Sequence, residues 1–181
     1  MKELILGITG SIAAYKAADL ANELTKKGTR VSCVMTAGGR RFLTPLTLQT
    51  LSKCRVYTDV FDESCPGEVS HIALATRAVG ALIAPASADF LAKAACGIAD
   101  DMLTATLLAL WDKPVVVCPA MNTNMYENPL TQRNIRTLRE LGWHIVEPRE
   151  SLLACGQVGK GALADLPTIL QTAESVFSLS D

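Results

Sequence analysis

Short apolar runs alternate along the chain with longer segments in which apolar side chains recur every three or four positions. The short runs are typical of strands, and the longer segments are typical of amphipathic helices. The expected strands are Glu3–Ile8, Arg30–Met35, Arg55–Val60, Ala81–Ala84, Pro114–Cys118 and His144–Val146. The expected helices span residues 11–27, 44–52, 88–97, 101–111, 128–141 and 166–178. Strands that alternate with helices in this way predict βαβ units around a parallel sheet.

The fold class that follows is α/β: a three-layer, Rossmann-like or flavodoxin-like fold with a parallel sheet of about six strands. In the first predicted helix, the polar residues form a stripe at helical spacing, which we assign to the solvent face: Lys16, Asp19, Glu23 and Lys26. The sequence contains no internal repeat, low-complexity tract or linker. We therefore expect a single domain over residues 1–181.

The composition narrows the classes of function. Of the 181 residues, 49% are hydrophobic and 19% are charged, and the mean hydropathy is +0.25. No apolar run approaches the roughly 18–20 residues of a membrane helix, so we expect no membrane span and infer a homo-oligomer that buries the apolar excess between subunits. The net charge of −1 and the lack of a run rich in Lys or Arg argue against a nucleic-acid partner.

The first residues and the cysteines bear on the compartment. The sequence passes from "MKE" directly into a predicted strand, which leaves no room for a signal peptide. The six cysteines show neither C-x-x-C pairs nor the Cys and His spacing of a zinc site. We therefore expect reduced thiols, no bound metal and a cytoplasmic location.

Ligands of open α/β sheets bind at the carboxyl ends of the strands, so the residues after each strand are candidates for a site. After the first strand, Gly10 permits close approach of a ligand to the backbone, and Ser11 precedes a predicted helix, a position suited to phosphate. The glycines do not match G-x-G-x-x-G, and Thr36 rather than an acidic residue follows the second strand. These features favour a mononucleotide over a dinucleotide as the ligand. Thr36 and Gly38 are expected to contact the same phosphate as Gly10 and Ser11.

Other candidates have a structural as well as a functional interpretation. Ser87 and Asp89 favour a helix start whether or not they contact a ligand. His71 begins a predicted short helix, and a lone histidine is more often structural than catalytic. Cys155 stands among glycines in "LLACGQVGKG", which favours an accessible thiol in a flexible segment. The segment "PAMNTNMYENP" at residues 119–129 is unusually rich in Asn and Met for a simple turn.

Five segments of the chain occur in the same order in one protein family: "GITGSIAAYK", "SHIALA", "PASAD", "PAMNTNMYENP" and "ACGQVGKG". Together they resemble the homo-oligomeric flavin-containing cysteine decarboxylases. Within that family the similarity is greatest to the members that decarboxylate 4'-phosphopantothenoylcysteine to 4'-phosphopantetheine in coenzyme A biosynthesis. The alternatives are a peptidyl-cysteine decarboxylase and a non-catalytic flavin-binding regulatory protein.

The resemblance implies FMN bound where the strand order reverses, between subunits of a homotrimer or an assembly of trimers. It implies FMN contacts at Gly10, Ser11, Ile12, Thr36, Gly38, Ser87, Ala88, Asp89 and Ala120. It implies catalytic roles for His71, for Asn122, which would hold the substrate carboxylate, and for Cys155, which would complete the reduction. Substrate contacts would come from Asn122, Met125 and Lys160. In family chemistry, a hydride passes from the substrate cysteine to FMN before CO2 leaves, so that no unstabilised carbanion forms.

The chain departs from the family pattern at two places. "PASANT" appears as "PASADF", which changes the residue at Asp89, and "G-x-G-R-M" appears as "GKGAL". The second change removes an arginine suited to the substrate phosphate, and Lys160 is the expected substitute, although a lysine lacks the planar fork of a guanidinium. The methionines of segment 119–129 and Tyr126 would form an apolar wall that excludes water from the carboxylate.

Overall fold

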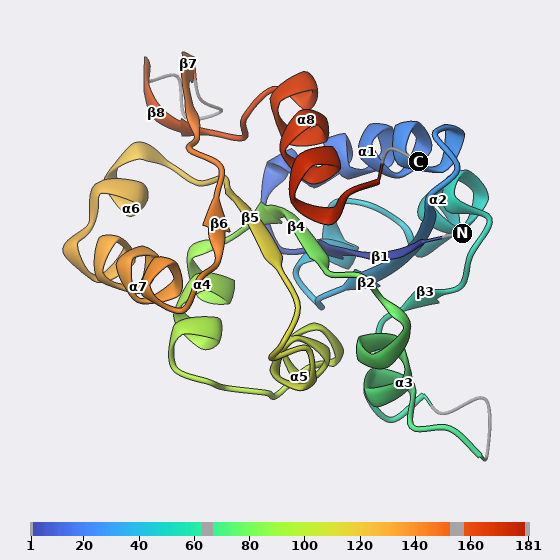
Figure 1. The fold of residues 1–181 in the computed structure, drawn as a ribbon. Helices are drawn as coiled ribbons and strands as arrows, with labels where there is room; N and C mark the ends of the chain where they lie inside the picture. Colours follow the sequence, from blue (N-terminus) through green and yellow to red (C-terminus); the bar gives the residue numbers. More distant parts are fainter. Residues whose placement is uncertain (1, 63–66, 153–157, 180–181) are drawn as a thin grey trace.

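The computed structural model describes residues 2–62, 67–152 and 158–179 of the 181-residue chain. Its centre is a six-stranded parallel sheet in the order β3-β2-β1-β4-β5-β6. The strands are β1 (Glu3–Ile8), β2 (Arg30–Met35), β3 (Val56–Tyr57), β4 (Ala81–Ala86), β5 (Val115–Pro119) and β6 (His144–Ile145) (Figure 1). The expected α/β class is therefore confirmed. Of the two expected topologies, this order is that of a Rossmann fold, and it reverses between β1 and β4.

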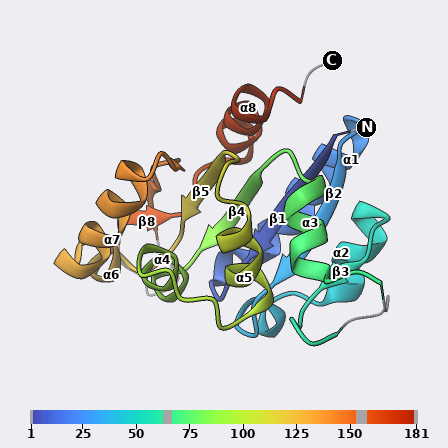
Figure 2. The ribbon, with the colours of Figure 1, turned by 60° about the horizontal axis from the view of Figure 1, so that its bottom comes forward.

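Helices cover both faces of the sheet (Figures 1 and 2). One face carries α1 (Lys16–Lys26), α2 (Pro45–Ser52) and α8 (Leu166–Phe177). The other carries α3 (Ser70–Arg77), α4 (Ala88–Ala95), α5 (Met102–Ala109) and α7 (Pro129–Glu140). Successive strand residues point to opposite faces, so Leu4 and Leu6 join the first core while Ile5 joins the second. The strands are buried on both sides, which explains why they appear in the sequence as continuous apolar runs.

Polar side chains define where two of these helices begin. Ser87 Oγ accepts a hydrogen bond from Phe90 N at 3.2 Å at the start of α4. Asp101 Oδ1 accepts one from Thr104 N at 2.8 Å at the start of α5. Each bond satisfies a backbone N–H that the first turn of a helix leaves unpaired. None of the helices in the described ranges is both long and apolar enough to cross a bilayer.

The strand expected over Arg55–Val60 is shorter than predicted, because only Val56–Tyr57 pairs with β2. Asp59 Oδ1 accepts a hydrogen bond from Phe61 N at 2.9 Å, and this local bond turns the chain away from the sheet edge. An aspartate two residues beyond the strand therefore ends it.

The helix expected over residues 11–27 starts with a different geometry. Its first turn is a 3-10 helix, η1 (Ile12–Tyr15), and the chain becomes α-helical only at Lys16. Ser11 Oγ accepts a hydrogen bond from Ala13 N at 3.3 Å at this start. Because a 3-10 turn holds about 3.0 residues rather than 3.6, the side chains around Lys16 are rotated relative to a continuous α-helix.

Several short elements have no counterpart in the sequence prediction. They are η2 (Gly39–Arg41), α6 (Thr123–Glu127), β7 (Arg149–Leu152) and β8 (Val158–Ala162). β7 and β8 pair antiparallel and form a separate two-stranded hairpin beside the main sheet (Figure 1). α6 and the hairpin lie near each other, and both contribute to the site described next.

Candidate active site

A cavity of about 490 Å³ lies at the carboxyl ends of β1, β4 and β5, where the strand order reverses. A volume of this size suits a small molecule or a cofactor. The predicted site residues that line the cavity are Gly10, Ser11, Ile12, Ser87, Ala88, Ala120, Asn122 and Met125. The fold thus brings together the turn after β1, the start of α4 and the loop after β5.

Gly10 and Gly38 make a close backbone contact beside this cavity. A β-carbon on Gly10 would lie 3.2 Å from the α-carbon of Gly38, and one on Gly38 would lie 3.0 Å from the α-carbon of Gly10. The turns after β1 and β2 approach this closely because neither residue carries a side chain. Thr36 Oγ1 accepts a hydrogen bond from Gly39 N at 3.1 Å and holds the second turn. Thr36 and Gly38 therefore support the Gly10 turn from outside the described cavity lining.

Thr9 is a residue of this region that sequence reasoning missed. Its buried hydroxyl donates a hydrogen bond to Pro85 O at 2.8 Å and accepts one from Ser87 N at 2.8 Å. These bonds tie the turn after β1 to the turn after β4 without competition from water. A threonine at the end of an apolar run is too ordinary a signal to identify this role from the sequence.

Asn122 begins α6, and its Oδ1 accepts a hydrogen bond from Asn124 N at 2.9 Å. That bond orients the carboxamide, so its NH2 is the end that can donate to a ligand carboxylate. Met121 and Met125 line the same cavity, and Met125 is 49% exposed. The loop after β5 therefore presents an amide beside two thioether side chains.

The β7–β8 hairpin packs against this loop. Met121 N donates a hydrogen bond to Gly161 O at 2.9 Å, and a β-carbon on Gly161 would lie 2.3 Å from Met121 O. A β-carbon on Gly159 would lie 2.4 Å from Thr123 Oγ1. The interpretation of the glycines around Cys155 as part of a flexible segment is therefore wrong for Gly159 and Gly161, which permit close packing of two chain segments.

Tyr126 and Lys160 are absent from the described cavity lining. Tyr126 is buried in the second core, and its hydroxyl donates a hydrogen bond to Glu147 Oε2 at 2.7 Å. Burial and the neighbouring Glu147 raise the pKa of Tyr126 to about 12. Lys160 Nζ donates to the same Oε2 atom at 2.7 Å and lies 5.5 Å from the centre of the Tyr126 ring. The structure thus gives Tyr126 a core position instead of the expected substrate wall, and it pairs Lys160 with Glu147.

Asp89 is also absent from the described cavity lining. Its side chain is 77% exposed and pairs with Lys93 at 3.6 Å, one turn further along α4. A carboxylate in the first turn of a helix is favourable without any ligand. Of the two interpretations that the sequence left open, the structure favours the structural one for Asp89, whereas Ser87 both starts the helix and lines the cavity.

His71 lies on α3, on the face of the sheet opposite α1. The last turn of α3 contacts the first residue of β1, so the helix runs antiparallel to the strands and begins at their carboxyl edge. Nδ1 of His71 is buried and has no hydrogen-bond partner among the residues that the structure describes. Asn122 lines the described cavity, whereas His71 does not.

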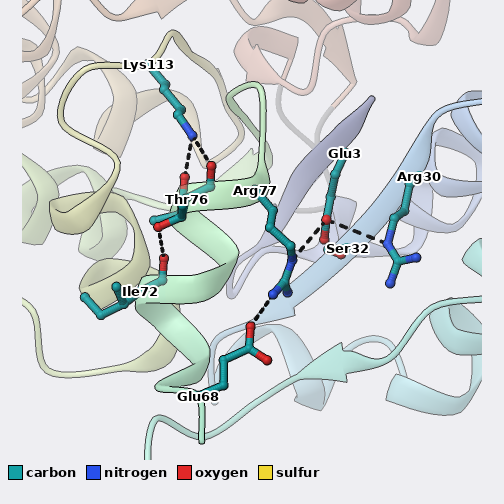
Figure 3. A network of polar contacts seen from close by, with 9 residues as sticks. Glu3, Arg30, Ser32, Glu68, Ile72, Thr76, Arg77 and Lys113 are labelled. Carbon is teal, nitrogen blue, oxygen red and sulfur yellow. Dashed lines mark hydrogen bonds and ion pairs between the residues drawn. The ribbon is translucent and has the colours of Figure 1, made fainter. Parts of the chain in front are cut away.

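A network of charged side chains fixes α3 against the sheet (Figure 3). Arg77 Nε lies 3.3 Å from Oε2 of Glu3, and the same guanidinium pairs with Glu68, just before the helix. The Glu3 side chain is only 8% exposed, and Arg30 Nε lies 3.7 Å from it. Lys113 Nζ donates to two carbonyl oxygens in the last turn of α3, each at 2.7 Å. These contacts hold the helix that carries His71 at both ends.

Lys16 and Arg149 are the charged side chains of the described cavity lining. Burial lowers the pKa of Lys16, and the charge of Arg149 lowers it further, while Asp165 acts in the opposite direction. Arg149 Nε donates a hydrogen bond to Leu163 O at 3.2 Å. Sequence reasoning placed Lys16 on the solvent face of its helix, and it did not consider Arg149. The position of Lys16 directly after η1 explains why it lies beside the cavity instead.

Cys155 lies outside the described residues, so its predicted role stays a prediction. Ser151 and Gly161, on the two strands of the hairpin, line the cavity. Of the described cysteines, Cys33 and Cys118 are buried, and burial raises the pKa of Cys33 to about 12. In the described ranges, no group of three or more His, Cys, Asp or Glu residues could hold a metal ion.

The carboxyl edge of the sheet fits a flavin mononucleotide. The contact between Gly10 and Gly38 leaves a stretch of bare backbone beside the Ser11 hydroxyl, which suits a phosphate and its chain. Ala88 and Ala120 offer small apolar surfaces on which a flat ring can lie. The described lining contains two cations and no carboxylate, so its charge favours an anionic ligand.

Comparison with known proteins agrees with this arrangement. The family model described as Flavoprotein matches residues 1–178. The chain is 52% identical over 174 residues to the probable phosphopantothenoylcysteine decarboxylase of Streptococcus mutans, across 96% of this chain and 97% of that protein. It is 46% identical over 177 residues to the coenzyme A biosynthesis bifunctional protein CoaBC of Bacillus subtilis. That match covers 98% of this chain and 43% of the bifunctional protein.

Solved structures with the same fold include enzymes of two kinds. The FMN-dependent cysteine decarboxylase SpaF matches with a TM-score of 0.85 and 36% identity, over 98% of each chain. A PPC decarboxylase mutant complexed with pantothenoylaminoethenethiol matches with a TM-score of 0.85 and 33% identity, over 99% of each chain. The chain therefore belongs to the Flavoprotein family, and within it to the branch of the phosphopantothenoylcysteine decarboxylases.

Proposed function

We propose that this protein binds FMN and decarboxylates 4'-phosphopantothenoylcysteine to 4'-phosphopantetheine in coenzyme A biosynthesis. The observation that carries the proposal is the cavity at the β1–β4 reversal, which brings Ser11, Ser87 and Asn122 together. The nearly full-length similarity to a probable phosphopantothenoylcysteine decarboxylase supports the substrate. The fold shared with an FMN-dependent cysteine decarboxylase supports the cofactor.

Asn122 positions the substrate for the loss of CO2. Bound FMN supplies the acceptor and donor of a hydride, so the carboxylate leaves from an oxidised substrate. The NH2 group of Asn122 donates a hydrogen bond to that carboxylate and holds it in place. A neutral amide stabilises the ionised carboxylate less than a charged partner does, so it orients the group without preventing its loss. Met121 and Met125 exclude water from the carboxylate, which further lowers its stability in the ground state.

We assign proton transfers to His71 and Cys155. The burial of His71 Nδ1 leaves Nε2 as the nitrogen that takes the proton of the substrate thiol when the cysteine carbon loses its hydride. Cys155 donates the proton that accompanies return of the hydride, which converts the enethiol into the saturated thiol. A thiol suits this step because its pKa of about 8.5 lies close to neutral pH.

A homotrimer, alone or within a larger assembly of trimers, completes the site. His71 does not line the cavity of its own chain, so in this proposal the partner subunit's His71 reaches the cavity across an interface. Three cavity-lining side chains support such an interface, because they are large, apolar and exposed: Ile12 at 59%, Tyr15 at 57% and Phe42 at 49%. Patches of this kind commonly mark subunit contacts.

Residues 1–181 act as one decarboxylase domain in this proposal, and the activity is cytoplasmic. The six-stranded sheet is built from the first to the last third of the chain, which supports one domain. The small-molecule substrate is the only partner that the site requires besides FMN and further copies of the chain.

The direct test is an assay of the purified protein with phosphopantothenoylcysteine under anaerobic conditions. We expect yellow protein, release of CO2 and a product lighter by one CO2. A peptide that ends in cysteine serves as the competing substrate in a parallel reaction. Turnover of the peptide alone would identify the protein as a peptidyl-cysteine decarboxylase. Bound FMN without turnover of either substrate would identify it as a non-catalytic flavin-binding regulatory protein.

A further inference from the structure

Two cations on separate elements face the same cavity. Lys16 is the first residue of α1, and Arg149 is the first residue of β7. Neither forms an ion pair within 4.0 Å with a carboxylate in the described ranges. Lys160 on β8, by contrast, lies 2.7 Å from Glu147. The cavity therefore holds positive charge that the protein itself does not pair.

The environment of Lys16 and Arg149 favours the binding of an anion between them. Burial and Arg149 lower the pKa of Lys16, so its charged form is costly in the absence of a ligand. The acidic group that acts on both cations is Asp165, but its carboxylate accepts a hydrogen bond from Thr168 N at 2.9 Å at the start of α8. An anion placed between the two cations relieves their repulsion, which Asp165 only partly offsets.

The geometry of Arg149 suits a phosphate in particular. Its Nε donates to Leu163 O at 3.2 Å, which fixes the plane of the guanidinium and leaves the two terminal NH2 groups as a fork. Arg149 also belongs to the hairpin that bonds to Met121, the neighbour of Asn122. One ligand can therefore place a carboxylate at Asn122 and a phosphate at Arg149 without crossing to another part of the molecule.

We propose that Lys16 and Arg149 bind the phosphomonoester of the substrate and thereby select phosphorylated over unphosphorylated pantothenoylcysteine. This inference rests on the proposed function for the identity of the ligand. It replaces Lys160 as the phosphate contact expected from the sequence, because Lys160 is paired with Glu147 and is absent from the described lining. The loss of the arginine in the "GKGAL" segment is then compensated from β7 and α1.

Calorimetric titration with 4'-phosphopantetheine and with pantetheine, which differ only in the phosphate, tests the proposal on the FMN-loaded protein. We expect Lys16→Gln and Arg149→Gln each to weaken phosphopantetheine binding by about tenfold or more, since each removes a charge-assisted hydrogen bond. The affinity for pantetheine should not change. Lys160→Gln is the matched control and should alter neither affinity. Arg149→Lys, which keeps the charge but not the fork, should lie between wild type and Arg149→Gln.

Two results would overturn the inference. An equal loss of affinity for phosphopantetheine and pantetheine would show that the two residues maintain the shape of the cavity but do not bind the phosphate. Loss of FMN from the variants, with retention of riboflavin and an unchanged preference for phosphopantetheine, would assign the cations to the FMN phosphate. Failure of the proposed function would be distinguishable from failure of this inference. If the wild-type protein binds phosphopantetheine through Lys16 and Arg149 but decarboxylates neither form of pantothenoylcysteine, the phosphate site stands and the proposed reaction is contradicted.

Discussion

Gly161 lies directly on the carbonyl group of Met121, with room for no side chain between them: a β-carbon would sit 2.3 Å from Met121 O. Its φ of +157° is also one that other residues rarely adopt. We expect Gly161→Ala to displace the hairpin from the loop that carries Asn122. The backbone conformation alone should cost about 1–3 kcal/mol. The expected result is a raised KM and a lowered kcat with FMN still bound, measured by steady-state kinetics and flavin absorbance.

Gly28→Ala is the control for backbone strain without a clash. Gly28 has a φ of +84°, and nothing lies within 4 Å of the place where its β-carbon would be. It should lower the free energy of unfolding but leave KM unchanged. Equal kinetic effects of the two variants would contradict the role of the Gly161 contact.

His71 and Asn122 should complement each other across subunits. His71→Asn and Asn122→Asp should each lower turnover by about 100-fold or more, the first by removing a proton acceptor. The second places a carboxylate against that of the substrate. Co-expression of the two inactive variants should produce mixed oligomers in which some sites keep both native residues, and activity should partly return. His144→Asn, a change of the exposed histidine on β6, serves as the active control.

A mixture that stays as inactive as its two components would contradict the shared site. The oligomeric state of each variant is checked by light scattering, so that failure to mix is not mistaken for failure to complement.

Cys155→Ser should separate the two halves of the reaction. A serine hydroxyl is a far weaker acid than a thiol and makes a poor proton donor, so oxidation and decarboxylation should proceed while the final reduction stops. The product should then be lighter than the substrate by CO2 and two hydrogens, as read by mass spectrometry under anaerobic conditions. Cys96→Ser changes an exposed cysteine and should give the saturated thiol at the wild-type rate. The same saturated product from Cys155→Ser would exclude this thiol as the donor.

Arg77 should matter more for stability than Arg30, although both face Glu3. Arg77 Nε lies 3.3 Å from Glu3 Oε2, whereas Arg30 Nε lies 3.7 Å away on a side chain that is 55% exposed. Arg77→Met leaves the buried carboxylate with its weaker partner, and we expect a loss of ~2 kcal/mol in the free energy of unfolding. Arg30→Met should cost less than ~1 kcal/mol. Urea denaturation measures both, and a larger effect of Arg30→Met would reverse the assignment.

The pair of Lys160 and Glu147 should show a defined pH dependence. Burial raises the pKa of Glu147, but hydrogen bonds from Lys160 and Tyr126 outweigh it and hold the pKa below the ordinary value of 4.5. A lowered folded-state pKa contributes stability that is present above the unfolded value and is lost as pH falls through the folded value. Lys160→Gln should therefore lower the free energy of unfolding near neutral pH, by less than ~1 kcal/mol for this half-exposed pair.

The difference between wild type and Lys160→Gln should shrink as the pH falls below about 4.5. Denaturation curves across a pH series provide the measurement. A difference that persists unchanged into acid would show that Lys160 stabilises the protein by packing on Tyr126 and not by its charge.

The main sheet could be predicted from the sequence because its strands are buried on both faces and appear as continuous apolar runs. β8 could not, since "VGKGA" has no apolar pattern, and its extended shape depends on contacts of Gly159 and Gly161 with a loop some forty residues earlier. Lys16 was misplaced for a related reason. A helical wheel assumes one continuous α-helix, and the 3-10 turn η1 changes the direction in which the first α-helical side chain points.

The position of His71 shows a different limit. Its motif identifies the residue, but which face of the sheet a helix covers depends on how the strands are ordered, and the linear pattern does not contain that order. For the segment that carries Asn122, the sequence placed the loop at the carboxyl end of a central strand, and the structure has it lining the cavity there; the role of Asn122 itself came from the family resemblance.

The β7–β8 hairpin forms its own small sheet, and it contacts the loop after β5 through the Met121–Gly161 hydrogen bond and the close approach of Gly159 to Thr123. The loops after β1 and β4, by contrast, follow directly from central strands of the main sheet. The sequence of the hairpin can therefore change without disturbing the folding of the six-stranded sheet and its helices. A lineage that acquires a different hairpin sequence would change which cysteine-containing acid it accepts and inherit the same decarboxylation chemistry.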